Sequence, residues 1–130
     1  MFTIEAIKAA HAKVKSGADF PHYIQDIIKL GVTGYKTYVS DSHAVFFGKD
    51  NYAVESVGKY ALLTIADKSD AVLFIKDLKE HQQGKSDYLS FCQSCAKYGV
   101  EKWVVDMAKM TCAYYDKAGN ELLVENIPSV

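Results

Sequence analysis

The sequence is poor in the residues that mark specialised chemistry. Its 130 residues include three cysteines, two prolines and one tryptophan. Three thiols cannot all pair with one another, and their spacing fits no disulfide framework. We therefore expect reduced cysteines and a cytoplasmic protein.

Long apolar runs and an excess of one charge are also missing. The longest apolar stretch, YALLTIA at residues 60–66, is far shorter than a membrane span. The N-terminal stretch carries Glu5 and lacks the pattern of a signal peptide. The formal net charge is -1, so no overall positive field attracts nucleic acid or an anionic membrane. We expect neither as a partner.

Motifs for phosphate or metal binding are absent from the sequence as well. It contains no GxGxxG and no GxxxxGKS or GxxxxGKT. Cys92 and Cys95 form a C-x-x-C, but zinc needs two more ligands, and no second C-x-x-C or H-x-x-x-H is present. We expect no metal and no cofactor.

Four segments have the apolar spacing of amphipathic helices. Residues 3–17 begin with Thr3 as N-cap and end at Gly17. Residues 19–31 have Asp19 as a cap. The third helix has Ser69 as its cap, and the fourth starts at Ser86. These last two segments cover residues 69–84 and 86–99.

Other segments have strand character, with β-branched and aromatic residues between turn residues. A tight turn through Asp41 and Ser42 joins the first two strands. Residues 60–66 fit either a strand or a buried connector. The predicted strands cover residues 35–39, 43–47, 52–57, 102–106, 110–116 and 121–127.

The two halves of the chain resemble each other at an offset of 68 residues. Six identities fall between residues 19–49 and their partners, where average composition gives about two. Convergence of two helix-to-strand units is the alternative explanation. We predict an α+β fold with four helices packed on an antiparallel sheet, in a single domain of residues 1–130. The domain consists of two related helix-helix-strand-strand-strand units with approximate two-fold symmetry, residues 1–62 and 69–130.

The repeat also suggests what the C-x-x-C is. Cys92 and Cys95 align with Ile24 and Ile27 on the apolar stripe of the second helix. Buried cysteine behaves as a small hydrophobic residue. We therefore predict that both cysteines are buried and bind no metal.

Asp41 and His43 are the candidates for catalysis. In the sequence SDSH, a carboxylate can orient an imidazole beside a serine nucleophile. Serine and aspartate also form turns by bonding their own backbone, and neighbours on a strand point to opposite faces. The turn-forming interpretation is favoured.

Tyr35 and Trp103 are the candidates for ligand binding. They occupy matching places on the first strand of each unit. If the two units are related by a two-fold axis, these rings face each other near it. They then line a pocket or fill the core, and core packing is favoured.

The runs LGVTGY, SDSHAVFFG and MTCAYYDKAGNE resemble the bacterial DUF1398 family over nearly the whole chain. The resemblance implies a small bacterial protein of uncharacterised function. Some family members are labelled phage envelope proteins, which implies a link to prophages. The family provides no catalytic residues to transfer.

Two functions remain open at this stage. The first is a non-enzymatic binding or assembly protein, with a homodimer as one expected form, because no catalytic motif is present and the strands are rich in aromatic residues. The second is a small enzyme or small-molecule-binding protein with a pocket near His43.

Overall fold

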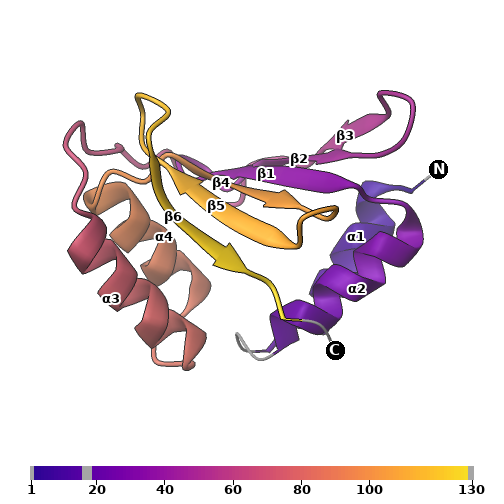
Figure 1. Cartoon of the computed structure of the whole chain (residues 1–130), viewed down its shortest axis with the longest axis horizontal. Coiled ribbons are helices and arrows are strands. Elements are labelled where there is room, and N and C mark those ends of the chain that lie inside the picture. Colours follow the sequence, from indigo (N-terminus) through magenta and orange to yellow (C-terminus); the bar gives the residue numbers. More distant parts are fainter. Residues whose placement is uncertain (1, 16–18, 129–130) are drawn as a thin grey trace.

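The fold is a single sheet with helices on one side. The computed structural model describes residues 2–15 and 19–128. Six antiparallel strands lie in the order β3-β2-β1-β4-β5-β6. All four helices lie against the same face, with α1 and α2 at one end and α3 and α4 at the other (Figure 1). The predicted α+β class is confirmed. The elements are α1 (Ile4–His11), α2 (Phe20–Leu30), β1 (Gly34–Tyr38), β2 (Ala44–Phe47), β3 (Ala53–Glu55), α3 (Ala71–Gln82), α4 (Tyr88–Lys97), β4 (Lys102–Asp106), β5 (Thr111–Tyr115) and β6 (Glu121–Asn126).

The first helix pair shows which boundary signals are reliable. The Thr3 hydroxyl accepts a hydrogen bond from the Ala6 N–H at 3.2 Å, as its N-cap role requires. Helix α2 ends at Gly31, whose φ of 107° is left-handed. Helix α1, however, ends at His11, well before the predicted stop at Gly17, which lies outside the described residues.

The starts of the other three helices differ from the prediction, either by one residue or in the hydrogen bond that the cap makes. Asp70, not Ser69, caps α3 by accepting from the Leu73 N–H at 3.1 Å. Asp87, not Ser86, caps α4 by accepting from the Ser90 N–H at 2.7 Å. Each carboxylate follows a serine directly, and as an anion it accepts the stronger bond. Asp19 makes no capping bond to α2 and accepts from the Lys15 N–H instead.

Residues 60–66 form an irregular connector and not a strand. The Tyr60 hydroxyl donates to the Val39 carbonyl at 2.6 Å, and the Ala66 N–H donates to the Ala96 carbonyl at 2.9 Å. Ile65, which precedes Ala66 in the sequence, is buried. Tyr60, Leu63 and Ile65 pack on the core, whereas Leu62 is 79% exposed. Among the described residues, no helix has the length and apolarity that a membrane crossing requires.

The central strands pair in a register that relates the two halves. Strand β1 pairs with β4, and Lys36 lies opposite Val104. These two residues are also partners at the offset of 68, so the register is the one that two-fold related units require. The neighbouring hairpins share a register too, with Tyr35 opposite Phe46 and Trp103 opposite Tyr114. A common origin of the halves stays a prediction.

The three cysteines lie in the core. Cys92 and Cys95 are fully buried on α4, and Cys112 is buried on β5. Their predicted burial is confirmed. Burial raises the pKa of each thiol, so the reactive thiolate is scarce at neutral pH.

Thiol labelling checks this arrangement. We expect the thiols of the native protein to react with an aromatic disulfide reagent no faster than the fold opens. In the denatured protein, all three cysteines of each chain should react. A rapid native phase would show that Cys92 or Cys95 is accessible and would contradict the packing described above.

Candidate functional site

Asp41 and His43 come together at the tip of the β1–β2 hairpin. Asp41 Oδ1 accepts from the His43 backbone N–H at 2.9 Å and lies 2.6 Å from His43 Nδ1. The intervening Ser42 has a left-handed backbone, with φ of 66°, which breaks the strand alternation. The imidazole stacks on the Tyr38 ring at 4.6 Å between centroids. The ring is therefore held on two sides.

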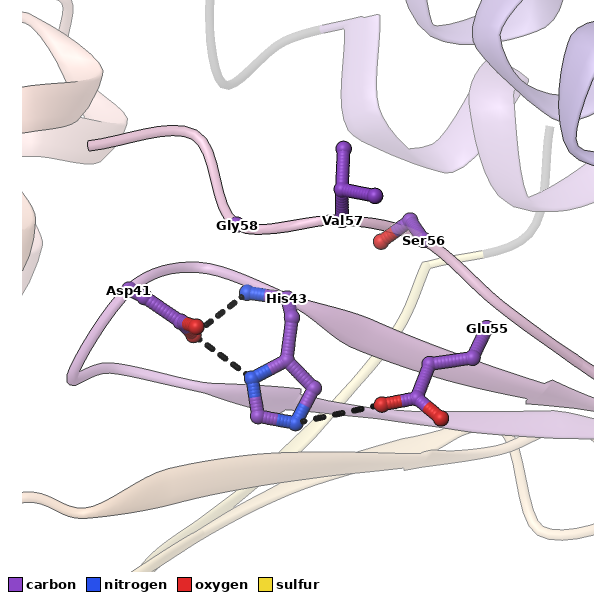
Figure 2. Close-up of a pocket in the computed structure, with 6 residues that line it drawn as sticks. All are labelled: Asp41, His43, Glu55, Ser56, Val57 and Gly58. Carbon is purple, nitrogen blue, oxygen red and sulfur yellow. Dashed lines mark hydrogen bonds and ion pairs between the residues drawn. The ribbon is translucent and has the colours of Figure 1, made fainter.

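A second carboxylate lies on the other side of the imidazole. Glu55 Oε1 is 3.7 Å from His43 Nε2, too far for a hydrogen bond (Figure 2). Strand β3 places Glu55 beside β2, because Val45 pairs with Glu55. The open depression around the imidazole is lined by Asp41, His43, Glu55, Ser56, Val57 and Gly58.

Residues 56–59, which follow β3, hold the tip of the β1–β2 hairpin in place. The Lys59 N–H donates to the Asp41 carbonyl at 2.7 Å, and Ser56 Oγ accepts from the Ala44 N–H at 2.9 Å. A Cβ atom on Gly58 would lie 2.9 Å from Asp41 Oδ2. Gly58 therefore leaves the space in which the Asp41 carboxylate lies.

The hydrogen bonds to Asp41 favour its ionised form. The bond from the His43 backbone N–H is the main reason that the pKa of Asp41 is lowered. An ionised Asp41 accepts a hydrogen bond from Nδ1–H, so a neutral ring in this position is the Nδ1–H tautomer. In that tautomer, Nε2 is an acceptor and faces Glu55.

A family model described as "Protein of unknown function (DUF1398)" matches residues 8–126. The chain belongs to this family. No curated protein matches its sequence.

Replacing Asp41 with asparagine tests the anchoring of the imidazole in this DUF1398 protein. We expect a loss of about 1 kcal/mol of stability at neutral pH, as for other charged capping interactions. The folded-state pKa of Asp41 is lowered, so its contribution is complete above the unfolded pKa near 3.8 and is lost as the pH falls through the folded value. Urea unfolding of both proteins from neutral to acidic pH should show the difference closing below about pH 4. A gap that persists in acid would contradict it.

The serine in the SDSH turn of this DUF1398 chain has a structural partner. Ser42 is buried, and its Oγ lies 2.5 Å from the Tyr88 hydroxyl on α4. Ser56 is likewise engaged, since its hydroxyl contacts both backbone groups of Ala44. Both hydroxyls tie the hairpin to the fold.

Tyr35 and Trp103 lie in two separate aromatic clusters. Both are buried on the helix side of the sheet. Tyr35 packs on Tyr23 and Phe46, whereas Trp103 packs on neighbours from the second half. The Trp103 neighbours are Tyr88, Phe91 and Tyr114. Ligand binding by either residue stays a prediction.

The sequence predicts Asp41 and His43 as site candidates but does not predict the other residues around the imidazole. Tyr38 and Glu55 reach it through strand register, which places residues from three strands side by side. A hairpin alignment of 43–47 with 53–57 would have brought Glu55 near. Within residues 2–15 and 19–128, no three histidine, cysteine or acidic side chains are placed to hold a metal ion.

Proposed function

We propose that this DUF1398 protein is a non-enzymatic binding protein whose ligand binds at the depression beside His43. The observation that carries the proposal is the imidazole itself, which Asp41 and Tyr38 hold with Nε2 facing Glu55 across 3.7 Å. A donor nitrogen placed beside these two atoms can lie within hydrogen-bonding distance of both.

The acceptor set favours a cationic ligand. Asp41 and Glu55 are carboxylates, and a neutral His43 offers only a lone pair at Nε2. A primary ammonium or guanidinium group can donate to Nε2 and Oε1 together and neutralise the acids. The side chain of Glu55 is 64% exposed, so a ligand can reach it without a rearrangement of the fold.

NMR of the imidazole nitrogens tests this function. Methylammonium chloride and guanidinium chloride are titrated into the protein, with sodium chloride at equal ionic strength as reference. We expect a saturable shift of the His43 Nε2 signal that is lost in Glu55→Gln. The control Glu5→Gln changes an acid on α1 and should behave as wild type. Shifts that sodium chloride reproduces would contradict the proposal.

A small enzyme is the second candidate, because a carboxylate that orients an imidazole is also the arrangement of a general base. Hydrolysis of p-nitrophenyl acetate distinguishes the two. Equal rates for wild type and His43→Gln support binding alone. A loss of about a hundredfold or more in His43→Gln would be the size expected for general-base catalysis and would support the enzyme.

A further inference from the structure

The sheet face opposite the helices carries a row of apolar and aromatic side chains. Inward residues such as Tyr35 and Val105 are buried under the helices, so the alternate residues point outward. In the part of the chain that the structure describes, no helix covers this side (Figure 1). We call it the outer face. It is formed by Lys36, Tyr38, Val45, Phe47, Lys102, Val104, Asp106, Tyr115 and Val124.

The exposed area of the protein is large for its mass. The accessible surface is 7529 Å², whereas a compact monomer of 14.4 kDa exposes about 6,800 Å². The excess is about a tenth of the expected area. On the outer face, Val124 is a large apolar side chain that is 43% exposed.

Strand β1 carries a hollow at one end and a ring at the other. The hollow lies over Gly34 and is bordered by Phe47, Val104 and Asp106. Four residues along the same strand, the Tyr38 ring lies on the same face. A surface that carries a hollow and a ring in reverse order is complementary to both at once.

Strand β4 carries side chains of opposite charge at its two ends. Lys102 stands at its first position and Asp106 at its last, and both point to the outer face. Any rotation that exchanges the two ends of β1 also exchanges the two ends of β4, because the strands are paired in register.

We propose that the outer face binds a second copy of this chain about a two-fold axis that runs across the strands, near Lys36 and Val104. This axis places Tyr38 over the hollow at the partner's Gly34 and Lys102 over the partner's Asp106. Each contact occurs twice, as in any isologous interface. A different protein would have to carry the same reversed pattern, whereas a second copy carries it by symmetry.

The distances between stacked sheets allow these contacts. Facing sheets lie about 10 Å apart and cross at about 30°. Lys102 and Asp106 are each two residues from the axis, about 7 Å along the strand, so the crossing displaces them by only a few ångströms. A lysine side chain covers that displacement.

Lys36 opposes the contact, because the axis brings it near Lys36 of the second copy and the two charges are alike. Its ammonium is directed over the Phe47 ring at 5.8 Å, away from the axis. The partner's Lys36 is directed to the opposite side by the same symmetry. The two charges therefore lie apart, each over an aromatic ring.

Sedimentation equilibrium of the full chain tests the dimer, with circular dichroism to verify folding. We expect wild type to dimerise with rising concentration. Val104→Glu should abolish dimerisation, because it replaces an apolar contact at the axis with two carboxylates that would lose their hydration in the interface. Lys102→Glu should weaken it at least about tenfold, since it places acid opposite acid. Val72→Glu, at a 79% exposed position on α3, is the matched control and should dimerise as wild type does.

Two results would overturn the proposal. One is a wild-type protein that stays monomeric at every concentration. The other is a dimer that Val72→Glu disrupts and Lys102→Glu leaves intact, which would place the interface on the helix side. If Val104→Glu fails to fold, Lys102→Glu decides alone. None of these variants alters the acceptor groups of the proposed ligand site, so the His43 titration can be repeated on each of them. Tyr38 belongs to both proposals, because its ring also stacks on His43.

Discussion

Replacing Phe74 with alanine is expected to lower the free energy of unfolding by about 3–5 kcal/mol. Phe74 is fully buried on α3, where its ring contacts Phe91 at 6.4 Å and Tyr114 at 5.1 Å between centroids. The loss combines the hydrophobic transfer of the ring with the cavity that it leaves between helix and sheet. Three elements depend on this ring, so the cavity cannot close by the movement of one of them.

Urea unfolding followed by circular dichroism measures this effect. Val72→Ala, two residues earlier on the same helix, is the matched control. Val72 is 79% exposed, and its replacement should change stability by no more than about 0.5 kcal/mol. Both proteins are compared at one protein concentration, since dimerisation would add to stability. A loss below about 1 kcal/mol for Phe74→Ala would mean that this half of the core is loosely packed.

Replacing Gly99 with alanine should cost about 2–5 kcal/mol, from two separate causes. The backbone of Gly99 is left-handed, with φ of +80°, which costs an ordinary residue about 1–2 kcal/mol. An added Cβ would also lie 2.8 Å from Ser69 Cα, a backbone atom that cannot rotate away. That contact forces apart the end of α4 and the segment before α3, and overpacking of this kind costs about 1–3 kcal/mol.

Gly84→Ala separates the two causes. Gly84 has nearly the same backbone, with φ of +78°, but a Cβ there would meet nothing within 4 Å. We expect this variant to lose only the conformational part, about 1–2 kcal/mol. The difference between the two variants in equilibrium unfolding then measures the contact with Ser69. Equal losses would show that the chain relaxes around position 99.

The regular part of the fold was predictable because it depends on local signals. The apolar stripe of residues 20–30, the glycine at 31 and the alternation along 102–106 each act within one element. The cap of α3 is Asp70 and not the predicted Ser69, because serine and aspartate side by side offer two acceptors for the same N–H groups. The run 60–66 was undecided because a buried connector and a strand share the same apolar composition.

The candidate site was only partly predictable for a related reason. Asp41 and His43 are near in sequence, but the turn at Ser42 decides whether they meet, and its left-handed conformation is unusual for serine. Glu55 and Gly58 join them through the β2–β3 register and the path of the following segment. These relations depend on tertiary packing, which hydrophobic periodicity does not encode.

The pairing of β1 with β4 has a consequence for how the protein is made. Its first half ends well before β4, so during translation one edge of β1 waits for a strand more than sixty residues away. Until then the ribosome-bound chain presents an open edge, and the β4 of a neighbouring nascent chain can fill it. We expect the amides that hydrogen-bond between β1 and β4 to gain protection together and last when refolding is followed by pulsed hydrogen exchange. Exchange of halves between chains is thus the misfolding route that this sheet order favours.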